Sequence, residues 1–260
     1  MALKRQRINI LGVKVDDISL KFALEAIINL AKGEKRGKYV VTVNSEFVMK
    51  ARRNAEFCRI LNNADLALAD GVGVAWAKLI FGGKEHDRIA GVDLVEKLCE
   101  ISAKKAIGVG FLGGFGGVAD MVKKRQLLRN PGLIVKISEP GDPTIGYDLR
   151  LKKQILRLGG VDILFVAYGM GQQEYWIERN RKKLDVGVFI GVGGALDYIS
   201  GVKRRAPDYM QAIGLEWLWR LGLEPWRIWR MRVLPVFLMS VLWDWRRFLF
   251  KGFLNRQFPR

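Results

Sequence analysis

The sequence predicts an α/β protein of Rossmann-like type, with a largely parallel sheet flanked by helices and a helical C-terminal appendage. Short apolar runs alternate with longer amphipathic segments from residue 9 to residue 192, an order typical of a doubly wound sheet. Half of the 260 residues are hydrophobic, enough for one sizeable core. Beyond residue 203 the composition becomes basic and tryptophan-rich, which indicates a separate segment.

The strands are predicted from apolar and β-branched runs that end at turn residues. We expect them at residues 9–15, 38–43, 65–69, 106–112, 133–137, 162–167 and 186–192. Helices are expected between them, at residues 20–30, 46–62, 72–80, 93–103, 118–129, 146–158 and 174–183. Ser19 is placed to cap the first helix, with Ile18 before it as a hydrophobic staple.

The C-terminal segment is strongly cationic. Residues 203–260 hold twelve basic and four acidic residues, a net charge of +8, and six of the eight tryptophans. We therefore expect an α/β domain at 1–202 and a helical appendage at 203–260, with short helices broken at Pro225 and Pro235. Its longest apolar stretch, residues 233–243, is well short of the roughly 20 residues that span a membrane.

The overall charge of +18 attracts polyanions such as nucleic acid, anionic lipid or phosphorylated ligands. Cys58 and Cys99 lie in helix-like apolar patterns, which favours buried thiols and a reducing compartment. A single histidine, His86, argues against a metal site built on His and Cys. The basic N-terminus lacks the apolar run of a secretory signal, so a soluble or peripheral protein is expected.

Polar side chains follow several predicted strands, where ligands bind in doubly wound sheets. Asp70 comes between an apolar strand and Gly71, a position that suits a general base. An Asp-Gly pair after a strand is also a common turn or helix cap. Thr42 and Asn44 carry the same two interpretations, because each side chain can cap a helix or bind a hydroxylated ligand.

A literal G-x-G-x-x-G spans Gly108 to Gly113 and is followed by a predicted helix. Backbone N–H groups in such a turn suit a phosphate. However, the motif begins inside the strand, and no clear acid lies about 20 residues beyond it, as a dinucleotide site requires. An NAD(P)-dependent oxidoreductase is therefore an alternative hypothesis, alongside an ordinary tight turn.

The appendage interleaves arginine with tryptophan, which suits an anionic membrane surface. The same mixture can bind single-stranded nucleic acid, and an ordinary solvated basic face is the third interpretation. Arg220, Arg227 and Arg230 are spaced by seven and three residues, which would place them on one face of a continuous helix. Pro225 interrupts that helix.

An ordered set of motifs resembles the WecG/TagA/CpsF family of glycosyltransferases. The matching stretches are residues 42–48, 69–73, 88–93, 173–174, 191–197, 203–207, 214–221 and 224–227. They follow the family order over residues 9–235. One position departs from the family: Gly171 stands where a proline is usual, so we expect a less constrained loop before Gln173.

The resemblance implies an inverting, metal-independent transferase without a cofactor. It implies transfer of an N-acetylmannosamine-type or related sugar from a UDP donor to a polyprenyl-diphosphate-linked sugar acceptor. Such products feed teichoic acid, enterobacterial common antigen or capsule synthesis. The resemblance further implies a cytoplasmic enzyme, peripherally attached by its appendage to the anionic inner face of the cell membrane. It points away from a nucleic-acid partner and leaves a homo-oligomer open.

The resemblance also implies roles for individual residues. Asp70 would be the catalytic base. Substrates would be bound by Thr42, Asn44, Arg88, Gln173, Arg220, Arg227 and Arg230. The residues themselves agree with this scheme, because no D-x-D metal motif follows a predicted strand and guanidinium groups are suited to neutralise a departing diphosphate.

Overall fold

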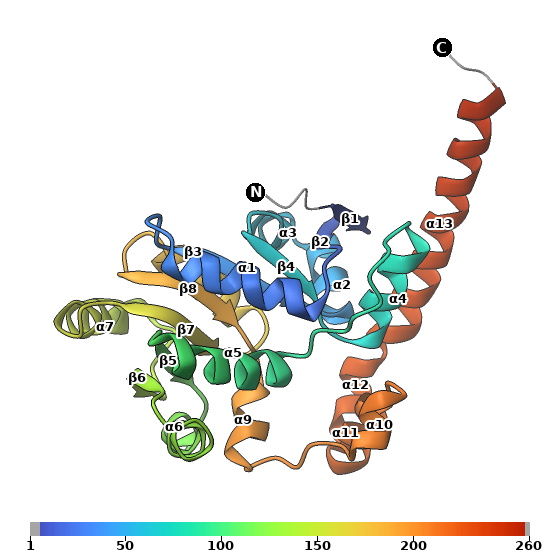
Figure 1. Cartoon of the computed structure of the whole chain (residues 1–260). Helices are drawn as coiled ribbons and strands as arrows, with labels where there is room; N and C mark the ends of the chain where they lie inside the picture. The colour runs from blue at the N-terminus through green and yellow to red at the C-terminus, as the bar shows by residue number, and fades with distance from the viewer. Residues whose placement is uncertain (1–5, 258–260) are drawn as a thin grey trace.

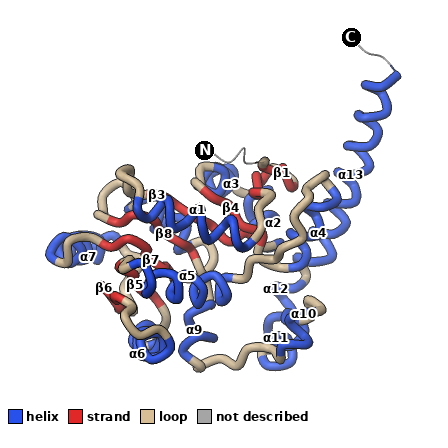
Figure 2. The backbone as a smooth tube through the Cα atoms, viewed as in Figure 1, coloured by secondary structure: helices blue, strands red, loops and turns tan. Residues whose placement is uncertain are grey.

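The computed structural model describes residues 6–257, with side chains at all of these positions except 212 and 248–257. It confirms the α/β class: a six-stranded parallel sheet has helices on both faces (Figures 1 and 2). The strand order is β4-β3-β8-β7-β5-β6. The strands are β3 (Lys38–Val43), β4 (Leu66–Ala69), β5 (Gly108–Gly113), β6 (Ile134–Glu139), β7 (Val161–Ala167) and β8 (Val186–Gly191).

The two faces of the sheet bury separate hydrophobic cores, as expected when helices cover both sides. One core is closed by α1 (Leu20–Lys32), α5 (Gly91–Lys105), α6 (Val118–Arg129) and α9 (Ala195–Ser200). The other is closed by α2 (Ser45–Arg53), α3 (Ala55–Asn62), α4 (Val72–Ile80), α7 (Ile145–Arg157) and α8 (Gln172–Asn180). All six strands therefore end at one edge, where their connecting loops meet the helices.

Two predicted elements are divided in the structure. The strand expected at residues 9–15 is a separate antiparallel hairpin, β1 (Arg7–Ile10) and β2 (Val13–Asp16), because Leu11 and Gly12 turn through positive φ angles of 52° and 96°. The helix expected at 46–62 breaks at Asn54, whose Oδ1 accepts a hydrogen bond from the Phe57 amide at 2.8 Å and caps α3. The predicted Ser19 cap of α1 is confirmed.

The G-x-G-x-x-G motif lies entirely within β5 and does not form a loop. Each of its six residues is buried. A Cβ at Gly110 would lie 2.4 Å from Ile137 Cγ2 and 2.8 Å from Leu164 Cδ1. This glycine is therefore required for close packing inside the sheet, and the strand interior offers no free N–H groups to a phosphate.

The C-terminal part is helical, as expected: α10 (Asp208–Ala212), α11 (Glu216–Leu223), the 3₁₀ helix η1 (Pro225–Arg227), α12 (Ile228–Met231) and α13 (Val233–Gln257). The predicted break at Pro225 is confirmed. The predicted break at Pro235 is wrong, because this proline lies in the first turn of α13. Backbone N–H groups in a first turn have no intrahelical partner, so a proline there removes no hydrogen bond.

Helix α13 packs against the sheet domain at its start and then runs away from it (Figure 1). Phe237 and Val241 are buried in the core beside α2 and α4. A Cβ at Gly73 would lie at an ordinary contact distance of 3.5 Å from the Phe237 ring but only 2.7 Å from Ser45 Oγ, so this glycine permits close packing of α4 against the start of α2. Within residues 6–257, no helix combines the length and apolar character of a membrane span. The basic residues Lys251, Arg256 and Arg260 lie outside the described side chains.

Candidate active site

Asp70 and Asn44 lie side by side where β4 and β3 end. The amide of Asp70 donates a hydrogen bond to the Val43 carbonyl at 2.8 Å, continuing the parallel ladder by one residue. Gly71 then adopts a φ of 95°, which reverses the chain into α4 without a side-chain clash. The turn leaves the Asp70 carboxyl group at the edge of the sheet, beside the start of α2.

Four charged residues surround the Asp70 carboxyl group. Burial is the main cause that raises the pKa of Asp70 to about 6, and the guanidinium groups of Arg220 and Arg88 act in the opposite direction. Glu216 and Asp93 raise it further. Hence the structure brings together Asp70, Arg88 and Arg220, three of the residues implied by the family resemblance. A carboxyl group with a pKa near neutrality is well suited to accept a proton.

Glu216 is the residue that fixes both arginines. It is buried at the start of α11. Arg88 Nη2 lies 3.3 Å from one of its carboxylate oxygens, and Arg220 Nη2 donates to the other. The guanidinium of Arg220 also lies 4.6 Å from the Tyr198 ring centroid. The pair of Glu216 and Arg220 could have been predicted from the sequence, because the two residues have the i, i+4 spacing of helical ion pairs.

A second ion pair joins the appendage to the sheet domain. Arg205 Nη1 lies 2.6 Å from Asp93 Oδ1, and Asp93 lies in the first turn of α5. Asp93 and Arg205 both lie within the motifs that resemble the family. Their residue types alone did not predict that they would pair with each other. Their pairing shows that residues beyond 203 contact the sheet domain beside Asp70.

Thr42 and Asn44 have partners within the protein. The Thr42 hydroxyl is buried and donates to the Gly191 carbonyl at 3.0 Å, which ties β3 to β8. The Oδ1 atom of Asn44 accepts from the Phe47 amide at 3.1 Å and caps α2. The amide NH₂ group of Asn44 has no hydrogen bond within the part of the chain described, so it is the donor left for a ligand.

Gln173 is a buried side chain that joins two loops. It is buried, and its Oε1 accepts from the Gly193 amide at 3.0 Å, which joins the loops that follow β7 and β8. The neighbouring Glu174 accepts from the Gly171 amide at 2.6 Å. Burial raises the pKa of Glu174 to about 7. These bonds hold Gly171 at a φ of 92°, a backbone conformation closed to proline.

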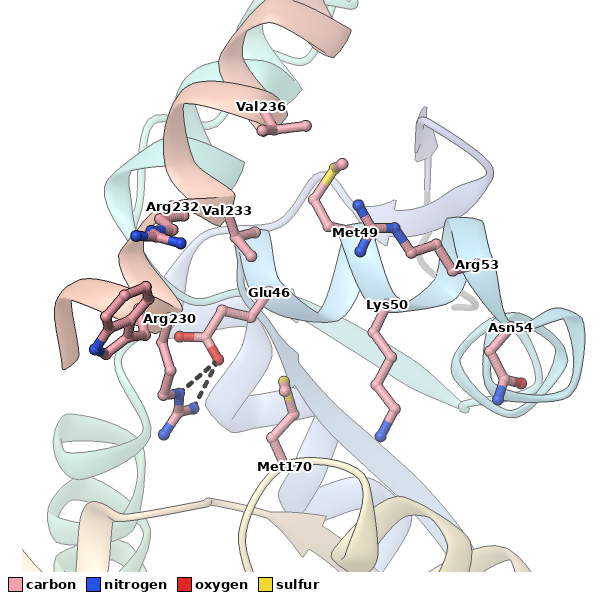
Figure 3. A pocket seen from close by; sticks show the side chains of 11 residues that line it. Glu46, Met49, Lys50, Arg53, Asn54, Met170, Arg230, Arg232, Val233 and Val236 are labelled. Carbon is pink, nitrogen blue, oxygen red and sulfur yellow. Dashed lines mark hydrogen bonds and ion pairs between the residues drawn. The ribbon is translucent and has the colours of Figure 1, made fainter. Parts of the chain in front are cut away.

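Arg227 and Arg230 take separate positions. Arg227 pairs with Glu224, which also contacts Lys203. Arg230 Nη2 lies 2.6 Å from Glu46 Oε2, at a cavity of about 700 Å³ (Figure 3). The cavity lies between α2, the β7–α8 loop and the α12–α13 junction. Its lining residues are Glu46, Met49, Lys50, Arg53, Asn54, Met170, Trp229, Arg230, Arg232, Val233 and Val236.

Neither Asp70 nor Arg88 lines this cavity. The two features are connected through α2, because Asn44 caps the helix beside Asp70 and Glu46 lies in its first turn. Within residues 6–257, no three His, Cys, Asp or Glu side chains gather as a metal site would need.

Comparison with known sequences shows which proteins this chain is similar to. A Bacillus subtilis (strain 168) protein named N-acetylglucosaminyldiphosphoundecaprenol N-acetyl-beta-D-mannosaminyltransferase is 33% identical over 218 residues, 80% of each chain. A Staphylococcus aureus (strain NCTC 8325 / PS 47) protein of the same name is 27% identical over 240 residues, 90% of this chain and 92% of that protein. The model of the glycosyl transferase WecG/TagA/CpsF family matches residues 8–250. The chain therefore belongs to the glycosyl transferase WecG/TagA/CpsF family, and it is a glycosyltransferase.

Proposed function

We propose that the enzyme transfers an N-acetylmannosamine-type sugar from a UDP donor to a sugar linked to a polyprenyl diphosphate, with inversion and without a metal ion. The names of the relatives support the sugar and the lipid-linked acceptor. The observation that carries the chemistry is the cluster of Asp70, Arg88 and Arg220, in which a carboxyl group with a pKa of about 6 adjoins two guanidinium groups.

In the proposed reaction, Asp70 removes the proton from the acceptor hydroxyl as that oxygen attacks the anomeric carbon of the donor sugar. The bond from this carbon to the UDP phosphate breaks on the opposite side, and UDP leaves with the electron pair. The anomeric configuration is inverted because attack and departure occur on opposite faces. The Asp70 proton then passes to solvent, which restores the base.

Negative charge develops on the diphosphate as the donor bond breaks. Arg220 and Arg88 are suited to stabilise it, because guanidinium groups bind phosphate oxygens through two parallel N–H donors. Glu216 fixes these side chains in place before substrate arrives. The NH₂ group of Asn44 and the hydroxyl oxygen of Thr42 are assigned to the acceptor sugar.

The experiment that tests the proposal is a thermal-shift panel of UDP-sugars on wild type and Asp70→Asn, paired with a transfer assay on a lipid-linked acceptor. UDP should raise the melting temperature of both proteins. Only wild type should transfer sugar. Full transfer by Asp70→Asn would reject the base, and stabilisation by NAD(H) without any response to UDP would support an oxidoreductase instead.

We further propose that residues 203–260 form an appendage that attaches the enzyme peripherally to the anionic inner face of the cell membrane. Its exposed side chains support this placement: Trp226, Trp229 and Trp243 are each at least 60% exposed, and the segment is basic. Tryptophan and arginine together are suited to the headgroup region. Salt-sensitive binding to phosphatidylglycerol vesicles, without binding to single-stranded DNA, is the expected result.

A further inference from the structure

The cavity of Figure 3 is lined by more basic than acidic side chains. Helix α2 contributes Glu46, Met49, Lys50 and Arg53, whose i, i+3, i+4, i+7 spacing places them on one face. Glu46 is occupied by Arg230. Among the described residues, no carboxylate forms an ion pair with Lys50, Arg53 or Arg232. The charge of Lys50 acts on buried Glu174, and Arg232 lies 3.8 Å from the Trp229 ring centroid. Three cations outside any ion pair of the described residues still line one cavity, which favours an anionic ligand.

Lys50 is held in a defined position. Its Nζ lies 4.7 Å from the Phe57 ring centroid and 5.7 Å from that of Tyr175. Both distances fall within the range of cation–π attraction. In Figure 3 the side chain extends from α2 toward Met170 of the β7–α8 loop. The ammonium group is thus positioned over aromatic rings and has its hydrogen-bond donors left for another partner.

Gly171 is the residue that leaves room for this ammonium group. A Cβ at position 171 would lie 2.2 Å from Lys50 Nζ. The φ of 92° also disfavours any residue with a side chain. The absence of the usual proline at this corner therefore has a structural consequence. A side chain at position 171 and the Lys50 ammonium group would compete for the same space, so a residue larger than glycine displaces the ammonium group.

The remaining wall of the cavity is apolar. It includes Val233 and Val236 from the start of α13. From there an exposed stripe continues along the helix, with Val236, Met239 and Trp243 at i, i+3 and i+7 and exposed by 45%, 70% and 60%. A free phosphate or a nucleotide would leave this wall and stripe uncovered. A diphosphate joined to a long hydrocarbon chain would cover both.

We propose that Lys50 binds the diphosphate of a prenyl-diphosphate lipid, and that Gly171 provides the space for the Lys50 ammonium group. Arg53 and Arg232 add positive charge to the lining of the same cavity. The isoprenoid chain leaves along Val233 and Val236. This inference rests on the proposed function, in which that lipid carries the acceptor sugar. Asn44 caps α2 beside Asp70, and Lys50 follows six residues later, about 9 Å along the helix axis. The sugar would therefore lie at one end of α2 and the diphosphate farther along it.

The test measures binding of farnesyl diphosphate, inorganic pyrophosphate, farnesol and UDP to the full chain by calorimetry. Lys50→Gln should raise the Kd for farnesyl diphosphate about tenfold to a hundredfold, as expected for loss of a charged hydrogen bond, and should leave the Kd for UDP within twofold. Lys50→Arg, which keeps the charge, should restore part of the affinity. Arg52→Gln is the matched control, because Arg52 is exposed on α2 outside the cavity lining and should change neither Kd.

Gly171→Ala gives an independent check that does not remove a charge. It should weaken farnesyl diphosphate binding by a similar factor, and combining it with Lys50→Gln should add less than twofold, since both changes act on one contact. Wild-type protein that fails to bind farnesyl diphosphate, or a Lys50→Gln variant that binds it normally or loses UDP equally, would overturn the inference. Absence of sugar transfer with intact Lys50-dependent binding would refute only the proposed function.

Discussion

Replacing Asp70 by asparagine should stabilise the protein while abolishing its activity. The pKa of Asp70 is raised from 3.8 to about 6, chiefly by burial. A rise of about 2 pKa units corresponds to about 3 kcal/mol at pH 7, at 1.36 kcal/mol per unit. Asparagine has nearly the shape of the protonated acid and carries no charge. Arg88 and Arg220 keep Glu216 as a partner in the variant, so neither becomes an unpaired buried cation.

The sign of the effect follows from proton linkage. Between about pH 4 and pH 6 the folded protein keeps the Asp70 proton while the unfolded chain has released it. The unfolding free energy of the wild type therefore decreases progressively as the pH rises through that window, and the full decrease is reached above it. The difference in unfolding free energy between Asp70→Asn and wild type should be near zero at pH 4 and reach up to about 3 kcal/mol at pH 7.

Urea unfolding of both proteins at several pH values from 4 to 7.5 measures this difference. Asp65→Asn serves as the control, since that carboxylate accepts from the Tyr39 amide and pairs with Lys38, each at 3.0 Å, and its removal should destabilise the fold. An Asp70→Asn protein that is less stable than wild type at pH 7, or a difference that does not vary with pH, would refute the reasoning.

Three further predictions concern the same region. The kcat/KM of wild type should fall about tenfold per pH unit below pH 6, because a base must be unprotonated to act; a flat profile from pH 5 to 7 would contradict the role of Asp70. Glu216→Gln should lower the unfolding free energy by about 3–5 kcal/mol and move the midpoint of the pH profile downward, since Glu216 raises the pKa of Asp70; an unmoved midpoint would count against the cluster. Phe237→Ala should lower the unfolding free energy by about 3–5 kcal/mol and make α13 more susceptible to limited proteolysis. An unchanged rate of cleavage in α13 would show that other contacts hold this helix against the sheet domain.

Much of the fold could be predicted because periodic patterns specify local structure. The helices at residues 72–80 and 118–129 and the strand at 38–43 have the predicted limits. Errors occurred where a single residue decides a turn. Leu11 adopts a left-handed conformation that its type does not suggest, and Asn54 divides one apolar pattern into two helices.

The order of the strands could not be derived from local patterns. Strand β8, the last in the chain, lies between β3 and β7, and this pairing depends on contacts between segments far apart in sequence. The same limit applied to the site. Asp70 could be placed at a strand end from the sequence, and Arg88 was assigned by the family resemblance. Only the fold shows that Glu216 fixes Arg220 beside them. The role of Lys50 depends on Gly171, which lies more than a hundred residues later.

The arginines of the candidate site are not fully satisfied by the protein. Nε of Arg220, and Nε and Nη2 of Arg205, are buried without a hydrogen-bond partner among the described residues. Leaving such a donor unpaired costs about 1–3 kcal/mol, and more for a charged group. Glu216 and Asp93 therefore hold the guanidinium groups in place without using all of their donors. In the proposed reaction, phosphate oxygens of the donor that reach these N–H groups would accept the hydrogen bonds, and part of the binding free energy would come from relieving a cost already present in the folded enzyme.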